Sequence, residues 1–293
     1  MYIVTSNCVT FCSWGGFMVP SLLPIIVDNR DGTPPSVACC IGYEMSKWRA
    51  KKLVKLILDS LPEFVLTEEE IADLSVLSPY STLEKSIPFF TNPNNPSSGG
   101  EIGELLAHKI LSRDFHTEQL VKRLRYKMRS RDAVTGFDIV HIRVDESGEL
   151  ELWLGESKFF SKRSTAIQKA IASLNDHIDS GILTERKSLI GPKISRSSPH
   201  FDKLQWLFHE DTNLDEIISR MVVPVFIASD TKITTVGELP TDYLNSVTVE
   251  LAEIASKVQA AHGHNLDFVF LYVPLNNKDT FDGVWATKLS AFA

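Results

Sequence analysis

Apolar and polar residues along the chain follow the two periods that are typical of an α/β protein. Residues 222–228 and 266–273 are almost uniformly apolar, which predicts central strands covered on both faces. We therefore expect a mixed central sheet flanked by helices. Apolar positions recur at helical spacing over about 165–178, 200–208, 214–221, 242–261 and a last stretch that ends near residue 291.

The N-terminal part of the chain is less regular. Residues 2–27 carry no charged side chain, but glycines and prolines interrupt the apolar run, so we expect short buried strands or irregular core segments rather than a signal peptide or a membrane helix. A helix is predicted over residues 46–61, ended by Pro62. Thr67 followed by Glu70 predicts a capping box at the start of the next helix.

Residues 91–100 consist almost entirely of Asn, Pro, Ser and Gly, which is typical of a boundary or a mobile loop. We place a division at residue 97, between an N-terminal region, 1–97, and a core domain, 98–293. The N-terminal region could form a docking surface for a partner, or it could simply complete the core.

Residues 137–145 and 149–159 predict the two strands of a β-hairpin. Both are rich in Ile, Val, Leu, Phe and Trp, and the three residues between them end in Gly148, which provides the positive φ that such turns need.

This loop fixes which residues of the two strands face each other. Asp145 then faces Glu149, and Asp138 lies directly opposite Glu156. The two-residue period of a strand places Lys158 on the same face as Glu156. We therefore expect two carboxylates and a lysine to converge.

Such a cluster has a chemical use. Two carboxylates on rigid strands suit a hard divalent cation such as Mg²⁺, or Mn²⁺ in its place, and leave positions open for water. The lysine could hold or deprotonate the attacking water. The alternative is a charged strand face exposed to solvent, and a loop shifted by one residue would separate the carboxylates. The apolar residues on both sides of Gly155-Glu156-Ser157-Lys158 favour the site.

A further helix is predicted over about residues 101–111, opened by Gly99-Gly100. Its first turn places Glu101 and Glu104 on one face. Acidic residues at a helix start are favoured by the helix dipole whatever the function. The pattern therefore leaves open which of the two faces the hairpin.

Basic side chains gather on both sides of the hairpin in the sequence. Residues 121–131 contain six of them, Arg131 being the last, and no acidic residue. They could contact DNA phosphates, which provide the sequence-independent part of affinity, or they could protect an edge strand from aggregation. The candidate DNA contacts are Lys122, Arg123, Arg125, Lys127, Arg129, Lys162 and Arg163.

Composition limits this interpretation. The net charge is −7 over 293 residues, so a nucleic-acid surface has to be local. The four cysteines lie in the first 40 residues without metal-site spacing, and we expect reduced, mostly buried thiols in a cytoplasmic protein. Residues 181–199 are predicted to form a mildly basic loop, and His262-Gly263-His264 is predicted to be a loop rather than a metal site.

Three blocks of sequence resemble a known family. They are similar to the PD-(D/E)XK nuclease superfamily and, more narrowly, to the HamA family, the nuclease subunits of Hachiman antiphage defence systems. The resemblance covers about residues 40–293 and is strongest between 98 and 170, although Phe137 stands where the superfamily has proline. The blocks are Gly100-Glu101-Ile102-Gly103-Glu104-Leu105-Leu106, Gly136-Phe137-Asp138 and Leu152-Trp153-Leu154-Gly155-Glu156-Ser157-Lys158.

The resemblance implies a restriction-endonuclease-like core and a metal-dependent deoxyribonuclease. It implies that Asp138, Glu156 and Glu104 are metal ligands, with Glu101 as the alternative helix carboxylate, and that Lys158 handles the water. It also implies a partner, a superfamily-two helicase that restrains the nuclease until the helicase engages DNA.

Two other functions are consistent with parts of the pattern. The fold could persist as a catalytically silent binding or scaffold subunit of a DNA-translocating complex, although the intact set of Asp138, Glu156 and Lys158 argues against decay. Paired carboxylates could also serve a glycosidase, but the adjacent lysine and the basic run fit that reaction poorly.

Overall fold

The structure is a computed structural model in which part of the chain is described. Most of the basic run, 123–131, lies outside the described residues, as do segment 91–98 and residues 263 and 264. The described residues are 11–14, 17–20, 23–45, 47–75, 78–90, 99–122, 136–178, 180–196, 198–233, 241–262 and 266–292.

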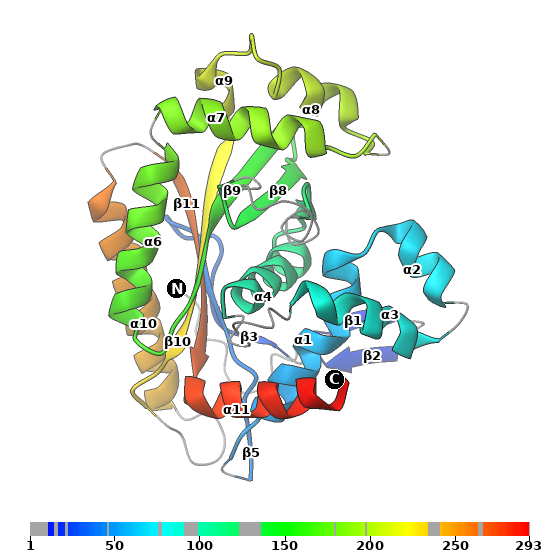
Figure 1. Ribbon diagram of the computed structural model, residues 1–293. Helices are drawn as coiled ribbons and strands as arrows, with labels where there is room; N and C mark the ends of the chain where they lie inside the picture. The colour runs from blue at the N-terminus through cyan, green and yellow to red at the C-terminus, as the bar shows by residue number, and fades with distance from the viewer. Residues whose placement is uncertain are drawn as a thin grey trace.

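A seven-stranded mixed sheet lies at the centre, in the order β3-β4-β11-β10-β9-β8-β7 (Figure 1). Strands β4, β11, β10 and β9 run parallel, whereas β3, β8 and β7 run antiparallel to their neighbours. The expected mixed sheet is confirmed. Its strands are β3 (Ile25–Asn29), β4 (Ser36–Cys39), β7 (Glu118–Gln119), β8 (Ile139–Val144), β9 (Leu150–Phe159), β10 (Met221–Asp230) and β11 (Asp267–Leu275). Two small antiparallel pairs are β1 (Phe11–Trp14) with β2 (Phe17–Pro20), and β5 (Tyr43–Glu44) with β6 (Lys47–Trp48).

Helices cover both faces of the central sheet (Figure 1). On one side, α6 (Arg163–Ile178) packs against β9 and α10 (Thr241–Ala261) lies beside it. On the other side, α4 (Gly99–Asp114) packs against β9, α1 (Ala50–Val65) packs against α4, and α11 (Lys278–Leu289) packs against α1. The remaining helices are α2 (Glu68–Ser75), α3 (Pro79–Ser86), α7 (Ser180–Ile190), α8 (Phe201–Leu207) and α9 (Leu214–Ile218), with short 3-10 turns η1 (Ile87–Phe89), η2 (Gly191–Lys193) and η3 (Ser290–Phe292).

Alternate residues of β9 belong to two different hydrophobic cores. Leu152 and Leu154 pack in the core that contains α6 and α10. Trp153 and Phe159 pack in the core that contains α1 and α4. Burying each such side chain contributes about 1.5–3 kcal/mol, so the two cores fix the register. Even-numbered residues of this strand therefore face α6 and odd-numbered residues face α4.

Gly155 allows β9 and β10 to approach closely. A Cβ atom at this position would lie 1.9 Å from the carbonyl oxygen of Pro224. Because no side chain fits there, the glycine is needed for the close approach of the two strands. The next residue, Glu156, then pairs with Val225 of β10.

Several predicted elements are confirmed closely. In the capping box, the amide of Glu70 donates to Thr67 Oγ1 (3.2 Å) and the amide of Thr67 donates to Glu70 Oε2 (3.0 Å). The free thiols of Cys39 and Cys40 are buried, as expected. Within the described part of the chain, no helix is both long and apolar enough to cross a membrane.

Two predicted boundaries are wrong. Helix α1 continues through Pro62 to Val65, because proline removes only one amide donor near the helix end and the side chains of Phe64 and Val65 are buried there. The predicted loop at 181–199 instead begins with a helix, α7 (Ser180–Ile190). In that helix the buried Lys187 donates to the carbonyl oxygens of residues 210 and 212 (3.1 and 2.6 Å). A lysine therefore occupies a buried position at which the sequence pattern would require an apolar residue.

The N-terminal region contributes to the same sheet as the rest of the chain. Ser36 of β4 pairs with Phe270 of β11, and α1 packs on α4. The division at residue 97 stays a prediction, but the two parts that it would separate share one sheet.

Candidate functional site

The hairpin of β8 and β9 has the predicted turn and register. The amide of Asp145 donates to the carbonyl of Glu149 (2.9 Å), and Gly148 has a φ of +84°. Ile139 pairs with Gly155, which sets Asp138 opposite Glu156. The predicted pairing is therefore confirmed.

Asp138, Glu156 and Lys158 meet on the α6 face of this hairpin. Lys158 Nζ lies 2.5 Å from Glu156 Oε2 and 3.1 Å from Asp138 Oδ2. The backbone amide of Ser157 also donates to Asp138 Oδ2 (3.2 Å). The expected convergence is confirmed, while the catalytic roles of these residues stay predictions.

The cluster is drier than an exposed strand face. Only 1% of the Glu156 side chain is exposed, against 16% for Asp138 and 14% for Lys158. Burial and the neighbouring Asp138 carboxylate raise the pKa of Glu156, in opposition to His177 and Lys158, which lower it. Burial lowers the pKa of Lys158, but the two carboxylates outweigh burial and the net pKa is raised. Lys158 therefore carries a positive charge between the carboxylates.

His177 completes the cluster, although the sequence did not single it out. It lies in the last turn of α6, with Nδ1 2.9 Å from Glu156 Oε1. Both atoms are buried, and within the described residues neither meets the geometry of a hydrogen bond, so the pair is a close contact at ion-pair distance. The imidazole also meets the ring of Phe137 edge-on, with 5.1 Å between the ring centroids. The only signal in the sequence is a histidine on the helix that follows the Glu-x-Lys strand.

Glu101 and Glu104 belong to α4, which packs on the other face of β9. A Cβ atom on Gly103 would lie 2.5 Å from Ser157 Oγ, and Ser157 points away from the side of Glu156 and Lys158. The Glu104 side chain is buried on the α4 side. Ligation of a metal by Glu104 or Glu101 stays a prediction.

Three of the predicted DNA contacts lie within the described residues. Lys162 is exposed, and Lys122 donates to the carbonyl of Glu63. Arg163 instead forms ion pairs with Glu250 (2.8 Å) and Glu253 (3.0 Å), which join α6 to α10. DNA binding stays a prediction for all seven, of which Arg123, Arg125, Lys127 and Arg129 lie outside the described residues.

The chemistry of the cluster suits a hard cation. Among the described residues, no three His, Cys, Asp or Glu side chains are grouped as a metal ion with an all-protein shell requires. However, Mg²⁺ usually keeps several waters and is held by one or two carboxylates. Asp138 Oδ2 and Glu156 Oε2 already point at one cation, the Lys158 ammonium. These residues fit Mg²⁺, provided that Lys158 moves aside.

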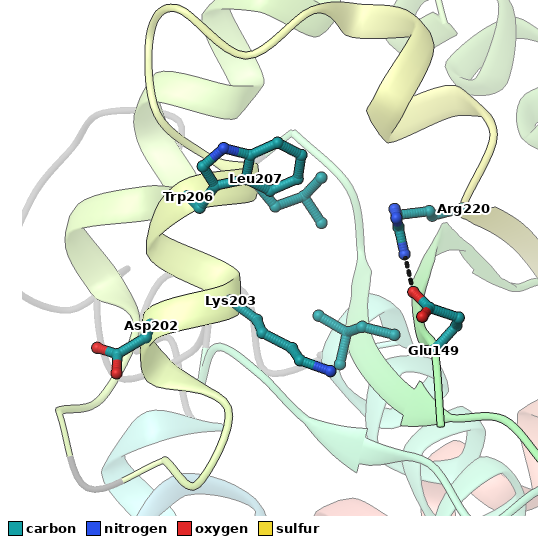
Figure 2. Close-up of a pocket in the computed structure, with 7 residues that line it drawn as sticks. Glu149, Asp202, Lys203, Trp206, Leu207 and Arg220 are labelled. Carbon is teal, nitrogen blue, oxygen red and sulfur yellow. Dashed lines mark hydrogen bonds and ion pairs between the residues drawn. The ribbon is translucent and has the colours of Figure 1, made fainter. Parts of the chain in front are cut away.

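Two cavities lie away from the cluster. One, of about 420 Å³, opens between α8 and the turn end of the hairpin, where Trp206 and Lys203 face the ion pair of Arg220 with Glu149 (2.8 Å; Figure 2). The other, of about 380 Å³, lies between α10 and the β3–β4 edge. The first cavity borders the start of β9, whereas Glu156 and Lys158 lie toward the end of this strand. Because no residue of the cluster lines either cavity, neither cavity is the candidate site.

The sequence matches a known protein family. The model of the HamA family matches residues 22–282, a range that includes β8, β9, α4 and α6. No curated protein matches the sequence significantly. Because the family model matches most of the chain, the chain belongs to the HamA family, which implies a role in Hachiman defence.

Proposed function

We propose that this protein is a Mg²⁺-dependent DNA nuclease, the effector of a Hachiman antiphage defence complex. The observation that supports this proposal best is the convergence of Asp138, Glu156 and Lys158 on one face of the hairpin, with the Lys158 ammonium within ion-pair distance of both carboxylates. Membership of the HamA family supports the same reaction class.

Each residue of the cluster has a defined task in this proposal. Asp138 and Glu156 hold the cation, with Glu104 or Glu101 as a further carboxylate, and the Ser157 amide fixes the orientation of Asp138 (3.2 Å). Bound Mg²⁺, or Mn²⁺ in its place, would lower the pKa of a water and stabilise charge that develops on the phosphate. Lys158, whose pKa is raised by the two carboxylates against the effect of burial, donates to a water or a phosphate oxygen.

DNA would reach this site along basic side chains near the hairpin. Lys162 is exposed directly after β9, and the run at 123–131 precedes β8 in the chain. Lysine and arginine contacts to phosphates give binding that does not depend on sequence. The proposed nuclease is therefore unselective by itself.

An unselective nuclease needs restraint, and we propose that a superfamily-two helicase provides it. The N-terminal region, 1–97, is the proposed docking part of the chain. Co-expression followed by size exclusion tests this step. The proposal is contradicted if the helicase never co-elutes, or if the mixture cleaves DNA like the free subunit under every DNA and ATP condition.

The activity itself is tested with purified protein and linear duplex DNA. We expect cleavage with Mg²⁺ and none with EDTA, and cleavage should return when Mg²⁺ or Mn²⁺ is added back. A wild-type protein that binds DNA but never cleaves it, alone or with the helicase, would instead support a binding or scaffold subunit.

A further inference from the structure

We propose that His177 is a positioning residue, which holds one oxygen of Glu156 so that the other oxygen is aimed at the cation. This inference rests on the proposed metal site and adds to it a residue from a helix that carries none of the predicted catalytic groups. The observation behind it is the 2.9 Å separation between His177 Nδ1 and Glu156 Oε1.

The two oxygens of Glu156 have different neighbours. Oε2 lies 2.5 Å from Lys158 Nζ, on the side of Asp138, whereas Oε1 faces His177. The terminal torsion of a glutamate is broad, so a carboxylate at the end of a strand residue is not oriented by the backbone alone. A partner on Oε1 removes that freedom. His177 is the group that the structure places there.

The imidazole is itself held in place. The ring of Phe137, the residue before Asp138, packs against it edge-on at 5.1 Å, and only 12% of the His177 side chain is exposed. Leu174 and Ile178 anchor the same turn of α6 in the core. Because the ring is fixed between a core helix and the start of β8, it can hold the Glu156 carboxylate in one orientation.

The arrangement matches the general behaviour of metal sites. Partners that orient a ligating carboxylate without touching the metal typically change affinity for the metal by about 10-fold to 100-fold when they are removed. A histidine that serves only packing would be replaceable by another aromatic ring. The two roles therefore predict different outcomes for two matched substitutions.

His177→Phe keeps an aromatic ring against Phe137 and removes the polar contact with Glu156, whereas His177→Gln keeps a polar side chain at this position and removes the ring. Titration of Mn²⁺ into the full-length protein by calorimetry, without DNA, reads out the site directly. We expect His177→Phe to weaken Mn²⁺ binding about 10-fold to 100-fold, and His177→Gln to stay within a few-fold of wild type. His209→Ala, at a histidine that is 58% exposed, is the control and should not change the affinity.

The loss of Mn²⁺ affinity in His177→Phe must also depend on Glu156. In a Glu156→Gln background, adding His177→Phe should weaken Mn²⁺ binding no further, since the two changes share one path. Circular dichroism and thermal unfolding of each variant establish that it is folded. If His177→Phe does not fold, His177→Leu, which also removes the polar contact with Glu156, takes its place with the same expected loss of affinity.

The outcomes separate this inference from the proposed function. If wild-type protein binds no Mn²⁺, the metal-dependent nuclease fails and the role of His177 fails with it. If wild type binds Mn²⁺ and Glu156→Gln weakens it, but His177→Phe binds as tightly as wild type, only the positioning role is overturned. The same holds if His177→Gln loses as much affinity as His177→Phe.

Discussion

The two faces of the β8–β9 hairpin both carry buried polar groups, but they treat charge in opposite ways. On the α6 face, the ammonium of Lys158 lies between Asp138 and Glu156. On the α4 face, His108 Nδ1 lies 3.3 Å from His141 Nε2, and His141 Nδ1 lies 2.8 Å from Thr117 Oγ1.

The difference comes from the presence of an opposite charge. Burial lowers the pKa of His108 to about 4, and burial together with His108 takes the pKa of His141 well below its ordinary value. These rings are therefore neutral near pH 7. The α6 face instead combines one cation with two carboxylates, so charge persists at low exposure. A buried group on this hairpin therefore keeps its charge where an opposite charge lies beside it, and we propose that the metal binds on the face where this happens.

The largest expected effect tests that assignment. Glu156→Gln and Lys158→Met keep side-chain volume but remove the charges, and each should reduce Mg²⁺-dependent DNA cleavage by more than about 100-fold. We choose Gln rather than Ala because the Glu156 side chain is only 1% exposed and a cavity would confuse the result. His108→Asn, on the opposite face, should cleave within a few-fold of wild type. Equal losses on both faces would contradict the assignment.

The second prediction concerns the ion pair that holds α6 in place. Arg163→Met removes the charge partner of the buried Glu250, and breaking a buried pair from one side costs about 3–5 kcal/mol. Urea unfolding should show this loss of unfolding free energy. Lys162→Met is the neighbouring control and should change it by no more than about 0.5 kcal/mol. If Arg163→Met unfolds like wild type but loses DNA affinity, Arg163 is a DNA contact after all.

The third prediction is the pH dependence of the neutral histidines. Because the folded-state pKa of His108 is lowered to about 4, its contribution to stability is complete above the unfolded value of 6.5 and is lost as pH falls toward 4. Between pH 7 and pH 5 this contribution should fall by about 2 kcal/mol. Urea unfolding of His108→Asn should show a shallower pH dependence than wild type. Identical slopes would mean that His108 is not buried as a neutral ring.

The smallest expected effect concerns the basic run before β8. Neutralising Arg123, Arg125 and Lys127 together should weaken DNA binding and flatten its salt dependence, by about 0.9 in the slope of log K against log salt for each lost phosphate contact. Fluorescence anisotropy at several salt concentrations measures the slope. An unchanged slope would favour a role in edge protection.

The hairpin shows how much of the site is predictable from local sequence. A glycine-ended turn and a two-residue period are enough to place Asp138 opposite Glu156 and Lys158 beside them. The face of Glu104 was not predictable in this way, because it depends on how α4 is rotated against the sheet. The packing of Gly103 on Ser157, and the core that α4 shares with Trp153 and Phe159, show that α4 covers the opposite side.

Contacts between distant elements account for most of what the sequence did not predict. His177 reaches Glu156 across the gap between α6 and β9, which no spacing in the chain encodes. Helix α7 was missed because Lys187 occupies a buried position and is satisfied by carbonyl oxygens of a later segment. Each of these features depends on tertiary partners that single-sequence patterns do not contain.

A crystal structure of the protein with saturating Mn²⁺, with the metal located by anomalous scattering, decides whether Asp138 and Glu156 bind the cation. We expect a peak about 2.0–2.2 Å from carboxylate oxygens of Asp138 and Glu156, with the Lys158 ammonium moved away from both. A peak elsewhere, or no peak while Lys158 still bridges Asp138 and Glu156, would contradict this expectation.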